Sequence, residues 1–395
     1  MLTILDITHI SYYSLFMVEK RYLFSHIQKD LKSKMVFIGG ARQVGKTTLA
    51  LKYLKPSDPK HPAYLNWDIS SHQENIIKNQ IPLKFKTIVF DEIHKYVKWR
   101  NFMKGLYDEH HRTHSFLVTG SARLDFFSKG GDSLLGRYHY YRLHPFSLFE
   151  INKNPTRKDL EQLLTFGGFP EPFSKQSKTF SKRWFRERRK RVIQEDIRDL
   201  QKIKEISYID LLIEALPSRV ASPLSIRSIK EDLQVSHQSI ENWIQILENL
   251  YMIFRIPPYG SPQIRAVKKE QKLYFFDWSH ILDENIKFEN LVASHLLKYC
   301  HYHEDINGDD MELRFLRDTD KREVDFVVLK NKKPLFAVEC KAGERALSPH
   351  LKYFKERTPI PLWFQVHRGK KDYGDEKTTG RVLPFTTFSK DHLKL

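Results

Sequence analysis

The residues best suited to chemistry lie in the first third of the chain, in the run GARQVGKT at residues 40–47. This run matches the pattern G-x-x-x-x-G-K-[ST] in full and follows an apolar segment, MVFIG at 35–39, that is typical of a β-strand. Glycines let a backbone wrap closely around a phosphate, so that its N–H groups face the anion. We therefore expect ATP to bind here, with Lys46 at the β- and γ-phosphates and the Thr47 hydroxyl as a ligand of Mg²⁺. The predicted ATP-binding residues of this loop are Gly40, Ala41, Arg42, Gln43, Val44, Gly45, Lys46, Thr47 and Thr48.

Two carboxylates follow a second apolar segment. Thr87 to Phe90 is typical of a buried strand, and Asp91 and Glu92 come directly after it. Asp91 is placed to hold Mg²⁺, and Glu92 is placed to polarise a water molecule for attack on the γ-phosphate. Either motif alone could occur by chance, but the two motifs in this order predict hydrolysis of ATP to ADP and phosphate.

Three further residues are candidates for the same site. The apolar segment FLV at 116–118 is followed by Thr119 and, two residues later, Ser121. These two either sense the γ-phosphate or the attacking water, or belong to an ordinary turn at a strand end. Arg137 can act on the phosphates within its own subunit or across the interface of a homo-oligomer, and one sequence does not separate these roles. The predicted catalytic residues are Glu92, Lys46 and Arg137.

Acidic residues near the end of the chain indicate a second chemistry. Asp325 and the run ECK at 339–341 lie on two apolar segments and fit the D…ExK pattern of a nuclease fold. Two carboxylates can hold Mg²⁺ while a lysine orients or activates water against a phosphodiester. We favour the alternative that such a core keeps these residues but only binds or supports the fold. The candidate nuclease residues are Glu289, Asp325, Glu339 and Lys341.

A formal net charge of +18 favours a polyanionic partner, of which nucleic acid is the commonest, and here DNA is favoured over RNA. The best local candidate is the basic run at 182–191, where Trp184 and Phe185 can pack inward or stack on bases. The alternative is a solvated helix face or a contact with an acidic partner. The predicted nucleic-acid contacts are Lys182, Arg183, Arg186, Arg188, Arg189, Lys190 and Arg191.

The bulk composition is that of a globular protein of two or three domains, because 395 residues with 41% hydrophobic side chains can bury sizeable cores. Cys300 and Cys340 are too few for a disulfide framework and lack metal-ligand spacing, which favours a reducing, cytoplasmic location. No stretch reaches the roughly 18 apolar residues that span a bilayer, so we expect no membrane partner. Residues 1–16 lack the basic start of a signal peptide, and we assign them no function.

Three patterns of secondary structure follow one another along the chain. Between residues 35 and 149, apolar strands alternate with amphipathic helices, which predicts a parallel sheet covered on both faces. The pattern is mostly helical from 155 to 249, and it changes again after a Pro/Gly break at 256–262. We predict an α/β chain with a P-loop NTPase domain of the additional-strand type, a helical winged-helix-like middle and a small α/β nuclease-like C-terminal domain. The expected boundaries are an N-terminal extension at 1–17, the P-loop domain at 18–150, the middle at 151–260 and the C-terminal domain at 261–395.

The middle segment contains the outline of a winged helix-turn-helix. Residues 225–233 and 236–247 predict two helices with N-caps Ser225 and Ser236, and residues 251–255 would form a wing strand. The exposed face of the second helix carries no Lys or Arg, whereas a helix that reads a DNA groove brings cations to the phosphates. We therefore favour a scaffolding role over base readout.

Taken together, these segments resemble a family of prokaryotic AAA-superfamily ATPases. The similarity begins near residue 18 and runs to the C-terminus, and the order of its segments makes it specific. Those segments are GGARQVGKTTLA at 39–50, VFDEIHKYVKWRNFMKGLYDE at 89–109, VTGSARLDFFSKGGDSLLGRYHYYRLHPFSLFE at 118–150, GGFPEPF at 167–173, DIRDL at 196–200, KLYFFDW at 272–278, REVDFVV at 322–328 and VECKAG at 338–343. The resemblance implies an ATPase module, a winged-helix-like middle, and a C-terminal domain of unknown function with a restriction-endonuclease-like core.

The leading hypothesis is an ATP-hydrolysing protein that works as a nucleotide-driven switch on nucleic acid. Two alternatives stay open, because a fold does not dictate function. One is an ATP-regulated, metal-dependent nuclease. The other is an ATP-controlled protein-binding or signalling module in which the nuclease-like core is inert.

Overall fold

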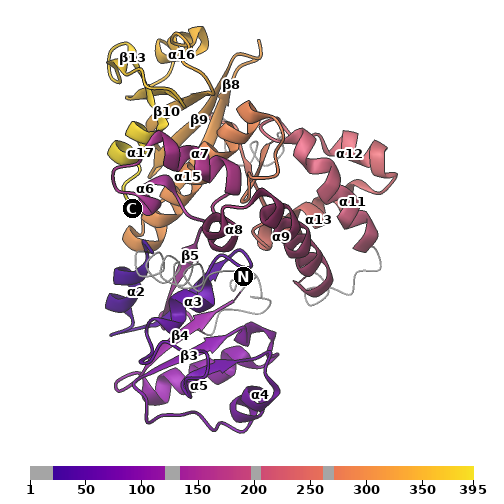
Figure 1. Ribbon diagram of the computed structural model, residues 1–395, viewed down its shortest axis with the longest axis vertical. Helices are drawn as coiled ribbons and strands as arrows, with labels where there is room; N and C mark the ends of the chain where they lie inside the picture. The colour runs from indigo at the N-terminus through magenta and orange to yellow at the C-terminus, as the bar shows by residue number, and fades with distance from the viewer. Residues whose placement is uncertain (1–20, 121–133, 197–205, 261–270) are drawn as a thin grey trace, which may run out of the picture. The chain divides into compact units, whose positions relative to one another are not determined.

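The computed structural model describes residues 21–120, 134–196, 206–260 and 271–395 (Figure 1). Ser121 and most of the DIRDL segment lie outside the described residues. The chain divides into two units. The first consists of Met1–His144, Arg188–Lys202 and Asn249–Tyr251, and the second consists of Pro145–Glu187, Ile203–Glu248 and Met252–Leu395.

The first unit is built on a parallel five-stranded sheet in the order β2-β3-β4-β1-β5. The strand β4 lies between β1, which leads into the P-loop, and β3, which leads into the carboxylate pair, so the predicted additional-strand arrangement is confirmed. The strands are β1 (Met35–Gly40), β2 (Tyr64–Asn66), β3 (Thr87–Asp91), β4 (Ser115–Thr119) and β5 (Tyr138–Leu143). Every residue of β1 is buried, as expected for a central strand covered on both faces.

Helices follow the strands in the order that the alternating pattern predicts. α3 (Lys46–Leu51) begins at the lysine of the P-loop and packs against β1, β3 and β4. The other helices of this unit are α2 (Phe24–Asp30), α4 (Ser70–Ile77), the 3-10 turn η1 (Ile93–Lys95) and α5 (Trp99–His110). Trp99, Met103 and Leu106 of α5 are buried at helical spacing, which fixes this helix against the unit.

The second unit begins with the short helices α6 (Leu148–Ile151), α7 (Arg157–Phe166) and α8 (Pro170–Lys175), and the next helix, α9 (Lys178–Arg191), passes at Arg188 into a segment of the first unit. A π-helical turn at Val192–Asp196 directly follows α9. The cap of α7 is a capping box, in which the Thr156 hydroxyl accepts from the Asp159 N–H and the Asp159 carboxylate accepts from the Thr156 N–H.

The predicted helix–turn–helix is present. α12 (Ile226–Leu233) and α13 (His237–Asn249) follow α11 (Ile206–Ala215) and the 3-10 turn η3 (Leu216–Arg219). Both predicted caps are confirmed, because Ser225 accepts from the Ser228 N–H at 3.3 Å and Ser236 accepts from the Ser239 N–H at 3.0 Å. The strands β6 (Ile253–Ile256) and β7 (Lys272–Phe275) then form an antiparallel pair. β7 lies in the expected C-terminal domain at 261–395, but it pairs with β6 in this two-stranded sheet and is not a strand of the six-stranded C-terminal sheet.

The C-terminal sheet has six strands in the order β12-β13-β11-β10-β9-β8. Its pairs β10–β11 and β11–β13 are parallel and the others are antiparallel, so the sheet is mixed. The strands are β8 (Met311–Arg317), β9 (Glu323–Lys330), β10 (Lys333–Lys341), β11 (Trp363–His367), β12 (Tyr373–Asp375) and β13 (Gly380–Pro384). The helices are α15 (Glu284–Asn307), α16 (Pro349–Lys355) and α17 (Phe385–His392). Its core includes Val324, Val327, Ala337, Leu351 and Trp363.

Candidate active site

The P-loop connects the end of β1 to the start of α3. Its backbone has positive φ angles at Gly40 (144°), Gln43 (65°) and Gly45 (98°). Gly40 is required for a second reason, since a Cβ atom there would collide with the carbonyl oxygen of Leu143 on β5. The positive φ angles of both glycines, and the close approach of Leu143 at Gly40, therefore favour residues without a side chain at these two positions.

Lys46 lies inside this loop. The residue is 6% exposed, and its ammonium donates to the carbonyl oxygens of Gly40 at 3.0 Å and Ala41 at 2.9 Å. The positive charge is thus already held where the sequence pattern places the phosphates of a nucleotide. The two hydrogen bonds to loop carbonyls compensate the buried ammonium for its lost contacts with water.

Asp91 is the centre of a buried hydrogen-bond cluster at the carboxyl end of β3. Its Oδ2 accepts from the hydroxyls of Thr47 at 2.7 Å and Tyr64 at 2.6 Å, and its Oδ1 accepts from Thr119. The parallel register explains the meeting, because Asp91 pairs with Thr119 on β4 and with Asn66 on β2. The structure therefore brings the predicted residues Lys46, Thr47, Asp91 and Thr119 to one edge of the sheet.

Tyr64 was not anticipated from the sequence. Burial, followed by the charge of Asp91, raises the pKa of its phenol well above the usual range, so the hydroxyl stays a donor. Asn66 donates to the same hydroxyl at 3.1 Å. The clue was the alternation of polar and apolar residues in the segment Tyr64-Leu65-Asn66, which places the two polar side chains on one face of a strand.

Glu92 occupies the turn directly after β3, at a φ of 56° that non-glycine residues rarely adopt. Its N–H donates to the carbonyl oxygen of Thr119 at 3.0 Å, which holds the turn against β4. Its carboxylate lies 3.7 Å from Nε2 of His94 and 3.8 Å from Nζ of Lys95. The Glu92 side chain is 18% exposed, so it is fixed by the fold and still reachable by water.

His94 is a second residue that sequence reasoning missed. Burial, followed by the charges of Lys95 and Lys46, lowers the pKa of its imidazole to about 3. At neutral pH the ring is uncharged, so it does not form an ion pair with Glu92.

The site offers oxygen ligands of the kind that Mg²⁺ prefers. The Thr47 hydroxyl and the Asp91 carboxylate are in direct contact, so one ion could use both. The chemistry of this pair fits a hard divalent cation bound together with phosphate oxygens. The assignment of Mg²⁺ to Thr47 and Asp91 remains a prediction.

Arg137 does not reach this site within the described structure. It immediately precedes β5, and its backbone C=O accepts from the N–H of Met35 at the first residue of β1, whereas the P-loop follows the last residue of β1. Its guanidinium instead forms a two-point contact with Asp108, at 2.7 and 3.1 Å. A role for Arg137 on the phosphates of its own subunit therefore has no geometric support, and a role across a subunit interface stays a prediction.

The basic helix α9 separates its cations into two groups. Lys182, Arg183, Arg186, Lys190 and Arg191 are exposed, and Arg189 is half-buried. Arg188 was wrongly included among the surface contacts. It is 2% exposed, and its Nε donates to the carbonyl oxygen of Arg42 in the P-loop at 3.3 Å. Trp184 faces inward as well, since its indole N–H donates to Glu171 at 2.9 Å.

The four candidate nuclease residues come from α15, β9 and β10. Asp325 Oδ2 accepts from the Cys340 N–H at 2.8 Å, and Lys341 donates to Glu339 Oε1 at 2.6 Å. Tyr274 of β7 donates to Glu289 Oε1 at 2.8 Å. Burial, followed by the charge of Asp325, raises the pKa of Glu289 to about 7 and that of Glu339 to about 8.

Lys272 and Glu323 belong to this cluster and were not predicted. The Lys272 ammonium lies 3.2 Å from Glu289, 2.5 Å from Glu323 and 3.5 Å from Asp325. Burial opposes its charge, yet these three carboxylates raise the pKa of Lys272 above its ordinary value. The D…ExK pattern predicts neither residue, and Lys272 lies on a strand, β7, that is not part of the pattern.

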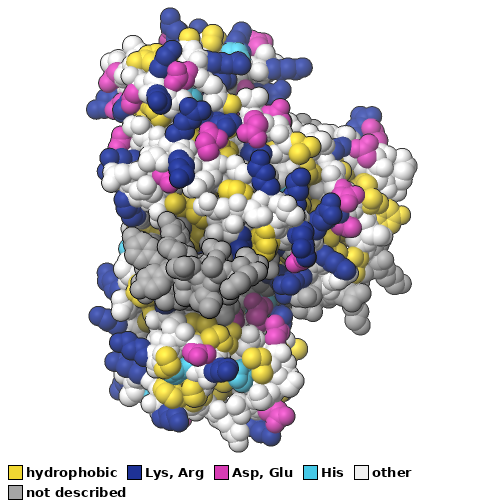
Figure 2. Space-filling view, in the orientation of Figure 1, with side chains coloured by type: hydrophobic (Ala, Val, Ile, Leu, Met, Phe, Trp, Pro, Cys, Tyr) yellow, Lys and Arg dark blue, Asp and Glu magenta, His cyan; other side chains and the backbone are white. Residues whose placement is uncertain are grey.

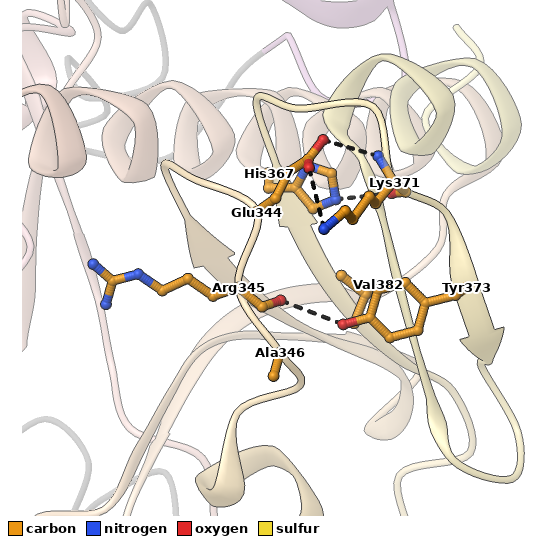
Figure 3. Close-up of a pocket in the computed structure, with 7 residues that line it drawn as sticks. All are labelled: Glu344, Arg345, Ala346, His367, Lys371, Tyr373 and Val382. Atoms are coloured by element: carbon orange, nitrogen blue, oxygen red, sulfur yellow. Dashed lines mark hydrogen bonds and ion pairs between the residues drawn. The ribbon is translucent and has the colours of Figure 1, made fainter.

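A cavity of about 280 Å³ lies beside the loop that follows β10 (Figure 3). Both ring nitrogens of His367 are engaged, with Nε2 at 2.9 Å from the carbonyl oxygen of Lys371 and Nδ1 accepting from the Gly369 N–H. Glu344 accepts from backbone N–H groups of the neighbouring loop, and the Arg345 side chain points away from the cavity. These groups hold the loop, and we assign no chemistry to the cavity. Its lining residues are Glu344, Arg345, Ala346, His367, Lys371, Tyr373 and Val382.

Three segments of the chain match known protein families. Residues 32–152 match a family described as AAA domain, residues 157–281 match a Domain of unknown function (DUF8612), and residues 286–388 match a Domain of unknown function (DUF4143). The chain therefore combines an AAA domain, which carries the P-loop, with a C-terminal domain of unknown function. This confirms the resemblance to AAA-superfamily ATPases of that organisation, while the restriction-endonuclease-like core stays a prediction.

The chain is also similar to an uncharacterized protein of Methanocaldococcus jannaschii, with 23% identity over 92% of this chain and 91% of the relative. Among solved structures it is similar to the Aeropyrum pernix ORC1 protein in complex with DNA, with 13% identity, a TM-score of 0.31, and coverage of 70% of this chain and 91% of that one. A mutant of Thermotoga maritima RuvB gives 15% identity, a TM-score of 0.31, and coverage of 61% and 89%. At these TM-scores, neither structure bears on the function of this chain.

Within the described residues, no helix has the length and apolar character needed to cross a membrane.

Proposed function

We propose that the AAA domain hydrolyses ATP and that its nucleotide state works as a switch on nucleic acid. The main support for ATP hydrolysis is a hydrogen-bond cluster in which the hydroxyls of Thr47 and Thr119 donate to Asp91. This cluster lies beside the loop that contains Lys46. Glu92 follows this cluster by one residue and remains partly exposed to water. A nucleotide-binding loop, a cation-binding pair and a general base thus lie at one end of the sheet.

Each residue then has one task. Lys46 exchanges the carbonyl oxygens of its loop for the β- and γ-phosphates and offsets the charge that develops on them. Glu92 accepts the proton of the attacking water. Thr47 and Asp91 would hold Mg²⁺, which supplies positive charge to the phosphate oxygens when bound.

The exposed side of α9 supports nucleic acid as the partner. Lys182, Arg186 and Lys190 recur every four residues and so share one helix face. No acidic side chain pairs with any of the three in the part of the chain that the structure describes. Figure 2 shows Lys and Arg side chains gathered over this helix. Cations without internal partners are free to neutralise phosphates of a polyanion.

Arg188 supports a link between the two activities. It lies on the same helix as the exposed cations, is buried, and contacts the P-loop carbonyl of Arg42. A nucleotide that reshapes the P-loop would alter this contact, and α9 would carry the change toward its exposed face. One helix, α9, thus carries both the residue that contacts the P-loop and the cations proposed to contact nucleic acid.

The test is phosphate release by the full chain with and without duplex DNA. The informative variant combines Lys182→Glu, Arg186→Glu and Lys190→Glu. A matched control reverses the same number of charges elsewhere, with Lys333→Glu, Lys352→Glu and Lys390→Glu, all of them exposed. We expect duplex DNA to stimulate wild type and the control, and to lose most of its effect on the α9 variant.

Stimulation that survives reversal of the α9 charges would refute α9 as the contact. Hydrolysis with neither DNA affinity nor stimulation would favour the other hypothesis, an ATP-controlled protein-binding module. The salt dependence of DNA affinity provides an independent check, because each lost phosphate contact lowers the slope of log K against log salt by about one.

A further inference from the structure

A positive charge already occupies the carboxylate cluster of the C-terminal domain. The Lys272 side chain is 1% exposed, and its ammonium lies within 3.5 Å of carboxylate oxygens from Glu289, Glu323 and Asp325. These acids come from α15 and β9, and two of them, Glu289 and Asp325, belong to the set expected to hold a divalent metal. The ammonium therefore performs the charge compensation that a metal would provide.

The remaining hydrogen-bond capacity of these acids is largely used by protein groups. Glu289 Oε1 also accepts from the Tyr274 hydroxyl, and Asp325 Oδ2 accepts from the Cys340 N–H. Lys341 is held by Glu339 Oε1 at 2.6 Å rather than directed toward a substrate. Among the acids of this cluster, within the described residues, one buried oxygen lacks a partner, Oε2 of Glu339.

A divalent ion does not fit beside this ammonium. Mg²⁺ in such a site draws carboxylate oxygens to about 2.1 Å, and the same oxygens would have to release or share Lys272. The side chain of Lys272 is enclosed by the protein, so it has no solvated position to move into without opening the domain. No group of three or more metal-binding side chains in the described part of the chain is arranged to hold an ion.

We propose that Lys272 is the resident cation of this cluster and takes the place of the divalent metal of a D…ExK site. The C-terminal domain then cleaves no phosphodiester by a metal-dependent route. Instead, the ion pairs join β7 to α15 and β9. This conclusion is independent of the proposed ATPase function, because every residue involved lies in the second unit.

The test measures binding of Mn²⁺, a spectroscopic substitute for Mg²⁺, by electron paramagnetic resonance. All proteins carry Asp91→Asn, which removes the acidic metal ligand of the P-loop site, and no nucleotide is added. We expect no saturable binding by this parent up to about 1 mM Mn²⁺. Lys272→Met keeps the length of the side chain but removes its charge, and it should gain a site that the further change Asp325→Asn abolishes.

Saturable binding by the parent that is lost with Asp325→Asn would overturn the proposal. Failure of a folded Lys272→Met protein to gain a site would also refute it. If that variant does not fold, Lys272→Arg is measured in its place, because it keeps the positive charge. Saturable binding of Mn²⁺ by Lys272→Arg or by the parent would contradict the proposal. Plasmid DNA should stay intact with Mg²⁺ or Mn²⁺, and cutting that depends on Asp325 would contradict the assignment.

Discussion

Replacing Lys46 with methionine isolates the contribution of one charge to nucleotide binding. Methionine has similar length and fills the same space without the ammonium. In the free protein the lost interactions are two hydrogen bonds to the loop carbonyls of Gly40 and Ala41. Because removing the charge also removes the cost of burying it, we expect the free energy of unfolding to change by only about 1 kcal/mol.

The effect on ATP binding should be much larger. In the complex the ammonium would donate to phosphate oxygens, and a hydrogen bond to a charged group contributes roughly 1.5–3 kcal/mol. The two carbonyl bonds given up in exchange also come from the charged ammonium and offset most of this gain, so the difference comes from the attraction between the ammonium and phosphate charges, about 3 kcal/mol for unit charges about 5 Å apart at an effective dielectric constant of about 20. This corresponds to a rise of about 150-fold in the Kd for MgATP.

Isothermal titration calorimetry of wild type and Lys46→Met with MgATP gives this ratio directly. The control is Lys78→Met, which removes an exposed lysine directly after α4 of the same unit and should leave the Kd unchanged. Unchanged affinity in folded Lys46→Met would show that the nucleotide does not use this loop, and the site assignment would then be wrong.

Two predictions concern the second unit. His295 accepts from the Leu148 N–H and, chiefly through burial, has its pKa lowered to about 3, so stability is retained above pH 6.5 and should fall by about 1.4 kcal/mol per pH unit below it. Urea unfolding at pH 7.0 and 5.5 should show a smaller loss in His295→Gln than in wild type, and equal losses would argue against a neutral buried ring. Thr156→Ala removes the capping box of α7 and should lower the free energy of unfolding by about 1 kcal/mol, whereas Thr156→Ser should be nearly neutral. A loss in the serine variant as large as that in the alanine variant would show that the hydroxyl does not cap the helix.

The P-loop domain could be predicted well because its signals are local. The glycine pattern, the apolar strand before it and the helix from Lys46 are continuous in the sequence, and the structure contains each of them. The strand β5 was missed because its segment YHYYRL is polar and lies at the edge of the sheet. Because β5 was missed, Arg137 could not be located at the amino end of that strand, away from the P-loop.

The burial of Arg188 could have been anticipated. It follows Trp184 by four residues, so the two side chains share one face of α9, and an inward-facing Trp184 implies an inward-facing Arg188. Because the run at 182–191 is rich in cations, the prediction treated all of them as exposed and did not use this four-residue spacing. Lys272 is a different case, because it meets Glu289 and Asp325 across 17 and 53 residues of sequence. Only the folding of β7 against α15 and β9 brings that lysine to the acids.

The most direct test of the account is the separation of ATP binding from ATP hydrolysis at Glu92. Glu92→Gln keeps the shape of the side chain but removes the base that accepts the proton of the attacking water. Glu109→Gln, at an exposed acid of the same unit, is the matched control. We predict that Glu92→Gln binds MgATP within about twofold of wild type and releases phosphate roughly 10²–10⁴-fold more slowly. Phosphate release at the wild-type rate in Glu92→Gln would contradict the proposed mechanism.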